Sequence, residues 1–283
     1  MLTICKAVSE DFDRVYPLFQ GFGDAPIPKD TWKKIFVTPW KSNEDFCGYL
    51  LLQDGAVKGY LGLIFSRRTL NDKIEKFCNM TSWVVSEDCR SKSLAMLLEV
   101  LKLNDYTLTN FTASPTVATI LGKLGFTEFA VDQRVLLPLP RIAGRGYGCD
   151  FDLQSIRRKL KDNDLRIFDD HQGLNCDHLL LQSDRGDCYV VLKHTVRRRV
   201  RFAKVHYLSK ADVFHECMQR LTAAICLRLK VFGILVDERY IGGRHFTASV
   251  KYPHQRKAYF KSGSITDPNC IDTLYSELVI LHN

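Results

Sequence analysis

The sequence predicts an α+β protein (α/β in some classifications) made of two domains. Segments typical of strands and of helices alternate along the 283 residues, each with the hydrophobic spacing of its kind. A proline- and glycine-rich stretch, residues 138–148, interrupts the pattern near the middle of the chain. We therefore expect a first domain over residues 1–139 and a second domain over residues 150–283.

The first half alternates strands and helices up to that stretch. Strands are expected over residues 2–8, 45–53, 56–68, 76–85, 106–113 and 127–139, and helices beginning near residues 9, 29, 94 and 115. Asp54-Gly55 is a strong hairpin signal, Ser114-Pro115 is typical of a helix start, and Gly125 is typical of a helix end. The predicted order is strand, two helices, hairpin, strand, helix, strand, helix, strand.

The second half has a related layout. Helices are expected over residues 153–160 and 211–230, and strands over residues 176–182, 187–196, 199–208 and 231–237. The hairpins that begin at Leu50 and at Leu179 both open with Leu-Leu-Leu-Gln and both close with arginines. Two amphipathic hairpins can look alike by chance, but we favour a degenerate second copy of the first domain.

The charge and cysteine usage narrow the classes of partner. A formal net charge of +8 favours an anionic partner. The densest basic run, Arg197 to Arg201, lies between two expected strands and is typical of a solvated hairpin turn. No aromatic residues interleave with it, which makes nucleic acid an unlikely partner.

No apolar run reaches the roughly 20 residues of a membrane span, so we expect no membrane partner. Ten cysteines without a CxxC pair, and no secretory signal, favour the cytoplasm.

The turn after the strand at 76–85 has the properties of an anion cradle. The first amides of the helix that follows have no partner within the helix and carry the positive end of its dipole. Arg90 and Lys92 add positive charge, and Ser93 offers a hydroxyl where such a turn often has glycine. The sequence therefore predicts a phosphate site at this turn.

With this turn and this element order, residues 2–137 resemble the GNAT superfamily of acyl-CoA-dependent N-acyltransferases. The family's turn reads Arg or Gln, two variable residues, Gly, one variable residue, and Gly or Ala. Arg90 and Ala95 match its outer positions, and Ser93 replaces the glycine. The helix that ends in Gly125-Phe126 also looks like that of the family.

The resemblance implies a GNAT fold with a mixed central sheet and acetyl-CoA, or another acyl-CoA, as co-substrate. The pyrophosphate would lie on the turn and the pantetheine arm between the fourth and fifth strands. The residues that this implies for coenzyme A binding are Trp83, Val84, Val85, Arg90, Ser91, Lys92, Ser93, Leu94, Ala95 and Ser114.

The catalytic groups are less clear from the sequence. Family members often use a carboxylate on the fourth strand as base and a tyrosine on the helix after the fifth strand as acid. Here the two positions hold Asn79 and Leu121. Transfer by proximity then remains, with Asn79 or Ser82 orienting the amine or a water.

We therefore expect an N-acyltransferase, with acetyl as the favoured acyl group, acting on a small-molecule amine. Without a base, an amine of lowered pKa fits best, such as an amino sugar. If the run from Arg197 to Arg201 reaches the cleft, its arginines could also hold an anionic group on the acceptor. The alternatives are a non-enzymatic acyl-CoA-binding protein and, less favoured, a nucleic-acid-binding protein. Residues 169–178 hold Asp, His and Cys, but their spacing matches no zinc pattern and we expect no metal.

Overall fold

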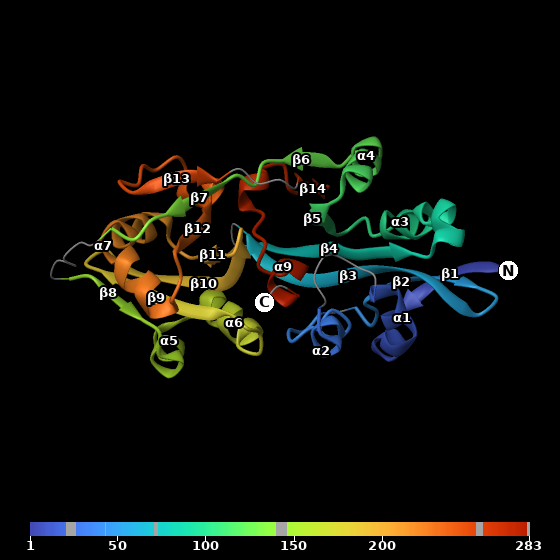
Figure 1. The fold of residues 1–283 in the computed structure, drawn as a ribbon, viewed down its shortest axis with the longest axis horizontal. Coiled ribbons are helices and arrows are strands. Elements are labelled where there is room, and N and C mark those ends of the chain that lie inside the picture. Colours follow the sequence, from blue (N-terminus) through green and yellow to red (C-terminus); the bar gives the residue numbers. More distant parts are fainter. Residues whose placement is uncertain (21–26, 43, 71–72, 140–145, 253–256, 282–283) are drawn as a thin grey trace. The chain divides into compact units, whose positions relative to one another are not determined.

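The structure is a computed structural model that describes residues 1–20, 27–42, 44–70, 73–139, 146–252 and 257–281 (Figure 1). The chain forms two compact units. Unit 1 consists of Met1–Phe129, Ala258–Cys270 and Tyr275–Leu281, and unit 2 of Ala130–Lys257 and Ile271–Leu274. Among the described residues, no helix combines the length and the apolar character needed to cross a bilayer.

Unit 1 is built on a seven-stranded mixed sheet, sheet A, with the order β1-β2-β3-β4-β5-β14-β6. Its strands are β1 (Leu2–Ala7), β2 (Gly48–Gln53), β3 (Ala56–Leu70), β4 (Lys73–Val85), β5 (Thr107–Ala113), β6 (Thr127–Phe129) and β14 (Lys257–Lys261). Strands β1 to β4 are antiparallel neighbours, whereas β4 and β5 run parallel. The hairpin predicted at Asp54-Gly55 is confirmed, since both residues have positive φ in the turn between β2 and β3.

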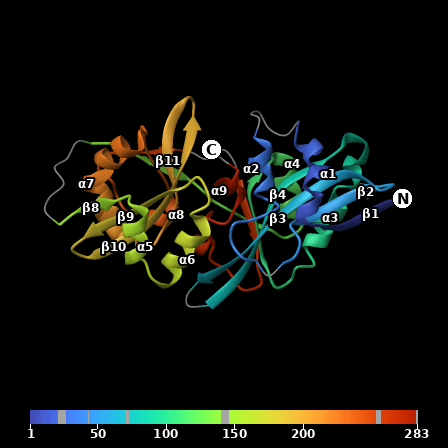
Figure 2. The same cartoon turned by 90° about the horizontal axis from the view of Figure 1, so that it is seen from below.

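Unit 2 contains a second seven-stranded mixed sheet, sheet B, with the order β8-β9-β10-β11-β12-β7-β13. Its strands are β7 (Gln133–Leu136), β8 (Gly148–Asp150), β9 (Asp177–Ser183), β10 (Gly186–Arg197), β11 (Val200–Leu208), β12 (Gly233–Asp237) and β13 (Ser249–Tyr252). Figure 2 shows the hairpin of β10 and β11 projecting beyond the neighbouring strands.

The two sheets repeat one topology with a strand exchanged between them. Strand β14, near the end of the chain, lies between β5 and β6 in sheet A, and β7 takes the matching place between β12 and β13 in sheet B. Each sheet also has a parallel pair of strands followed by a bulge, at Ser82 in β4 and at His206 in β11. The predicted tandem repeat of an α+β fold is therefore confirmed.

The domain boundary expected between residues 139 and 150 includes residues 140–145, which lie outside the described part of the chain. The compact units divide the chain elsewhere, with the first change at Phe129. We expected residues 127–139 to form one strand that closes the first domain. Instead β6 stays in sheet A, whereas β7 pairs with β12 and β13 in sheet B. Strand pairing uses backbone groups, so the side chains of β7 do not reveal which sheet it joins.

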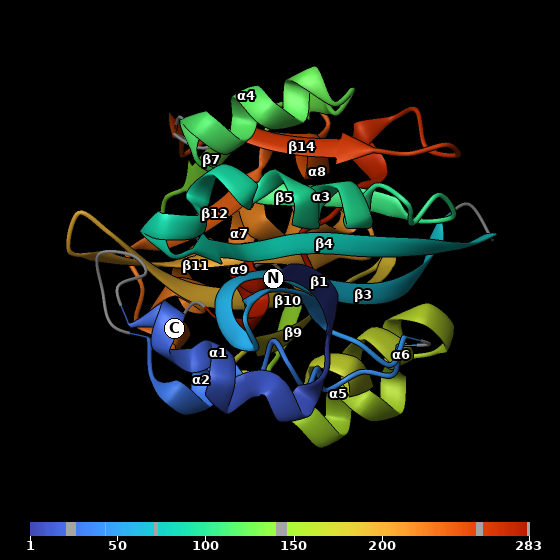
Figure 3. The ribbon, with the colours of Figure 1, turned by 90° about the vertical axis from the view of Figure 1, so that its right-hand side faces the viewer.

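Helices cover both faces of sheet A, with α1 (Phe12–Phe19) and α2 (Lys29–Lys33) on one face and α3 (Leu94–Val100) and α4 (Pro115–Lys123) on the other (Figure 3). The α1 face is aromatic: Phe19 stacks on Trp32 at 4.2 Å between ring centroids. A fifth helix, α9 (Glu277–Ile280), is also part of unit 1 and is almost entirely buried.

The buried face of α3 differs from the expected one. The spacing of the leucines at 94, 97, 98 and 101 predicted a single apolar face, but the helix buries Met96, Leu97 and Val100 and exposes Leu94 and Leu98. A 3₁₀ helix, Glu87–Lys92, runs directly into α3. A 3₁₀ helix turns once every three residues, whereas an α-helix turns once about every 3.6. It therefore rotates α3 about its axis, so that different side chains of α3 face the sheet.

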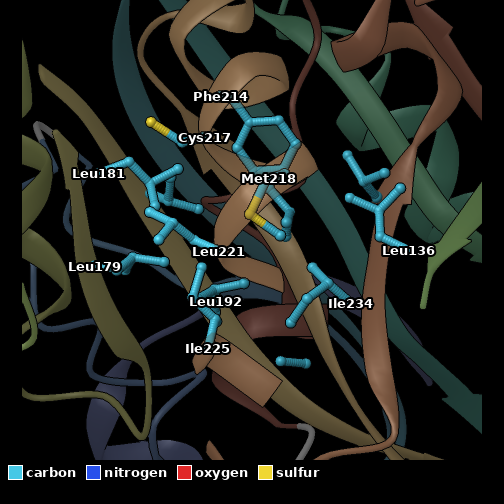
Figure 4. Packing of buried hydrophobic residues seen from close by; sticks show 14 of the residues in the cluster. Leu136, Leu179, Leu181, Leu192, Phe214, Cys217, Met218, Leu221, Ile225 and Ile234 are labelled. Carbon is cyan, nitrogen blue, oxygen red and sulfur yellow. The ribbon is translucent and has the colours of Figure 1, made fainter. Parts of the chain in front are cut away.

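In unit 2, the long helix α7 (Ala211–Leu229) supplies one side of the hydrophobic core, as its predicted amphipathic pattern required. Phe214, Met218 and Ile225 of α7 pack with Leu192 and Ile234 of sheet B (Figure 4). The remaining helices of unit 2 are α5 (Leu153–Lys159), α6 (Asp162–His171) and α8 (Glu238–Ile241). Phe168 of α6 packs against His178 and Tyr189 of sheet B.

The strand exchange predicts that residues 1–139 do not form a stable domain alone. A fragment of these residues lacks β14, so β5 and β6 lose the strand between them and expose unpaired backbone groups. We expect the fragment to lose the cooperative thermal unfolding of the full chain, measured by circular dichroism. Adding a peptide of residues 255–283 should restore it in part. Cooperative unfolding of the fragment alone, with the melting temperature of the full chain, would contradict this expectation.

The buried imidazole of His178 predicts a loss of stability in acid. This side chain is 4% exposed, and burial, helped by nearby His171, lowers its pKa from 6.5 to about 4. The folded chain therefore keeps His178 neutral at a pH where the unfolded chain binds a proton, so stability falls as the pH drops from 6.5 towards 4. Between pH 7.5 and pH 5 this group should remove about 2 kcal/mol from the free energy of unfolding. Urea unfolding of His178→Gln should show a flatter pH dependence, whereas His245→Gln, an exposed control, should keep the slope of the wild type.

Candidate functional site

The candidate site of unit 1 lies where β4 and β5 stop pairing. The two parallel strands pair only from Phe77 with Thr107 to Asn79 with Thr109, although β4 continues to Val85 and β5 to Ala113. The amide of Asn110 then bridges the strands, its Nδ2 donating to the carbonyl oxygen of Met80 at 3.1 Å. The Asn110 side chain thus takes the place of a backbone amide of β5 as the partner of the Met80 carbonyl. Beyond this bond the two strands separate.

A bulge in β4 follows directly. Tyr60 pairs with Val84 and Gly62 with Thr81, so Ser82 and Trp83 together lie opposite one residue of β3. Ser82 has φ of 50°, a left-handed conformation that is costly for serine. Bulges of this kind redirect the end of a strand and occur often beside functional sites. Ser82, a predicted catalytic candidate, therefore shapes the path of the β4 backbone. Its Oγ lies 3.2 Å from Thr81 Oγ1.

A carboxylate that the sequence did not indicate lies in the same opening. Asn79 Nδ2 donates to Glu277 Oε2 at 2.5 Å, and Thr112 Oγ1 donates to Glu277 Oε1 at 2.7 Å. Thr109 Oγ1 in turn donates to Asn79 Oδ1 at 3.2 Å. Asn79 and Thr109 are buried, and Glu277 is 3% exposed. The network holds the Glu277 carboxylate in one orientation between β4 and β5.

Glu277 comes from α9, which Ser276 caps by accepting from the backbone amide of Leu278. It is 198 residues from Asn79 in the sequence. The local signal, a serine before a glutamate, marks a helix start but not where that helix packs. Asn79, the other predicted catalytic candidate, uses both atoms of its amide within the network and so positions the carboxylate.

The predicted phosphate turn is more helical than expected. Arg90, Ser91 and Lys92 belong to the 3₁₀ helix, and α3 begins at Leu94. Ser93 joins the two with φ of −59°, so the position filled by glycine in the family needs no left-handed backbone here. This explains why serine can stand at that position.

The charge of this turn is partly offset by its own acidic residues. Lys58 Nζ lies 2.8 Å from Asp88 Oδ2, and this pair lowers the pKa of Asp88. Arg90 lies 3.8 Å from Glu87. Lys92 is exposed and, within the described part of the chain, forms no ion pair. Positive charge for an anion therefore comes chiefly from Lys92 and the exposed guanidinium of Arg90.

The end of β4 carries a buried hydrogen-bond donor, the indole of Trp83. Trp83 and Val85 are half-buried and pack against the hydrophobic core of unit 1, whereas Val84 pairs with Tyr60 of β3. The indole Nε1 of Trp83 is buried and bonds to no described residue. A pantetheine arm carries amide carbonyls, and one of these suits such a donor. The residues after the bulge thus fit the coenzyme A arm that the fold implies.

Ser114 is occupied by a structural role. Its Oγ accepts from the amide of Val117 at 3.3 Å, which confirms the predicted cap of α4, with Pro115 in the first turn. Ala95 lies one residue inside α3. No cluster of three metal-binding side chains occurs among the described residues.

No protein-family model and no curated protein matches the sequence, but solved structures do. A GCN5-related N-acetyltransferase from Anabaena variabilis matches with a TM-score of 0.58 at 10% identity, covering 92% of this chain and 72% of that one. One from Kribbella flavida has a TM-score of 0.59 at 11% identity, covering 92% and 70%. A tandem GNAT protein from the clavulanic acid biosynthesis pathway has a TM-score of 0.53 at 13% identity, covering 94% and 100%. The chain therefore has the fold of the GNAT acetyltransferases.

Proposed function

We propose that the chain is an acyl-CoA-dependent N-acyltransferase whose site is the opening between β4 and β5 of unit 1. The observation that carries this proposal is the early end of pairing at Asn79. It is followed by the bulge at Ser82 and by the indole of Trp83, which bonds to no described residue. An acyl-CoA held there would supply an activated thioester. The amides and cations of the turn at residues 90–95 would hold its pyrophosphate.

The chemistry is direct transfer. The acceptor nitrogen attacks the thioester carbonyl carbon, the carbon–sulfur bond breaks, and the thiolate of coenzyme A leaves. The attacking nitrogen must lose a proton during this step, and water or a hydroxyl group must protonate the leaving thiolate. Holding both reactants in the opening supplies the proximity that we expected as the main mechanism.

Glu277 is the group that we propose to accept the proton. Its carboxylate lies beside Asn79, the position where a carboxylate was expected and an amide was found. Asn79 and Thr112 fix its two oxygens, so they are positioning residues in this proposal. Ser82 shapes the strand beside it through its left-handed backbone.

The acceptor we propose remains a small amine of lowered pKa, such as an amino sugar. A carboxylate base is weak, so transfer is fastest for an amine that is already partly neutral near pH 7. A non-enzymatic acyl-CoA-binding protein is the alternative, and it requires binding without turnover. Acyl transfer to a panel of amines separates these two functions.

Coenzyme A should bind at the turn and raise the melting temperature in proportion to the logarithm of its concentration above the Kd. Ser93→Gly should bind as tightly as the wild type, because glycine leaves the amides open. Ser93→Val should lose roughly tenfold to hundredfold in affinity, because a β-branched side chain crowds the phosphates. Isothermal titration measures both, with the melting temperature of each ligand-free variant as the control for folding. Equal affinity of Ser93→Val and the wild type would place the phosphates elsewhere.

Glu277→Gln should lower kcat by roughly 100-fold or more with little change in KM, because it keeps the shape of the network but removes the base. Glu128→Gln removes a carboxylate that accepts from Tyr259 in the same unit and should leave the rate unchanged. If Glu277→Gln transfers acyl groups at the wild-type rate, Glu277 is an anchor for α9 and the acyltransferase proposal is unaffected.

A further inference from the structure

The tip of the β10–β11 hairpin carries an unusual density of positive charge. Residues 196–201, here called the basic tip, read Val-Arg-Arg-Arg-Val-Arg and are all exposed. Val196 pairs with Arg201 and Arg197 with Val200, so Arg198 and Arg199 form a two-residue turn. The hairpin projects from its sheet (Figure 2). The expected solvated turn is confirmed. Exposure to solvent alone does not explain why the turn consists of arginines.

The backbone of the turn makes the arginines costly. Arg198 has φ of 49° and Arg199 has φ of 66°, both left-handed. Two-residue turns of this kind favour Asn-Gly, because asparagine and glycine adopt positive φ with less strain. Arginine at both positions therefore weakens the hairpin, and a role for the charge would account for it.

No described residue forms a direct ion pair with the arginines of the tip. Arg197, Arg198 and Arg199 form no ion pair with any residue that the structure describes. Arg201 Nη2 lies 3.2 Å from His194 Nδ1, and only through this imidazole does it connect to Asp177. Three guanidinium groups thus remain available to an external anion.

Apolar side chains accompany these cations. Val196 is 57% exposed, and Phe232, the residue before β12, is 56% exposed. The amide of Phe232 donates to the carbonyl oxygen of Arg201 at 2.8 Å, which places it beside the tip. Its ring contacts Phe202 at 5.7 Å between centroids. The same end of unit 2 therefore offers guanidinium groups and apolar surface together.

We propose that the basic tip and Phe232 form a docking surface for an anionic lipid bilayer. The arginines match the headgroup phosphates in charge and in their bidentate geometry, and the exposed valine and phenylalanine suit the boundary between headgroups and acyl chains. A nucleic acid backbone would use the cations but leave the apolar side chains without a partner. This proposal departs from our expectation of no membrane partner. That expectation rested on the lack of a membrane-spanning run, and binding to the surface of a bilayer requires no such run.

The test uses the full chain and vesicles of equal parts phosphatidylcholine and phosphatidylserine. The deciding variant combines Arg197→Gln, Arg198→Asn and Arg199→Gly, which removes three charges and gives the turn the sequence that its backbone favours. Its melting temperature should equal or exceed that of the wild type, so any loss of binding is not a loss of folding. A control variant, Lys33→Gln with Arg158→Gln and Lys251→Gln, removes three exposed charges elsewhere and has the same net charge.

The wild type and the control variant should sediment with the anionic vesicles, less so as salt rises, and not with pure phosphatidylcholine vesicles. The turn variant should lose roughly 100-fold in partition coefficient, and Phe232→Ser should lose less. The proposal is overturned if the wild type does not bind the anionic vesicles or binds both kinds of vesicle equally. It is also overturned if the turn variant binds as well as the wild type. Tighter binding to duplex DNA at the same salt, lost in the turn variant, would assign the surface to nucleic acid and also overturn it.

Discussion

Each sheet of this protein depends on a strand that comes from a distant part of the chain. Strand β14 separates β5 from β6 in sheet A, and β7 separates β12 from β13 in sheet B. Both inserted strands satisfy backbone groups on two sides, which no side-chain interaction could replace. The integrity of unit 1 therefore rests on residues that follow the whole of the second sheet in sequence.

The same dependence governs the candidate site. Once β14 has joined sheet A, the chain continues to α9, and Glu277 reaches Asn79 and Thr112 where β4 and β5 separate. An opening made by the end of strand pairing thus receives its carboxylate from the last helix. The two copies of the fold share the early end of parallel pairing, which stops at Asn79 in β4 and at Lys204 in β11.

Local features could be predicted from the sequence because their causes are local. The turn at Asp54-Gly55, the cap at Ser114 and the left-handed Gly125 depend on neighbouring backbone, and the structure has all three. The resemblance of the first half to GNAT proteins gave the fold for the same reason, through element order. The prediction of the buried face of α3 was wrong because the rotation of a helix about its axis also depends on the segment before it, here a 3₁₀ helix. Glu277 and the exchange of β7 for β14 could not be foreseen, since pairing across more than a hundred residues leaves no local pattern.

The exchange also orders events during synthesis. Strand β6 is complete at Phe129, but β14 begins only at Lys257, an interval on the order of ten seconds at ordinary rates of translation. Throughout that time β5 and β6 present open edges, of the kind that pair with other chains when exposed. A cell that makes this protein must shield a nascent half-sheet, so the yield of native molecules should depend on chaperones that act on the ribosome-bound chain.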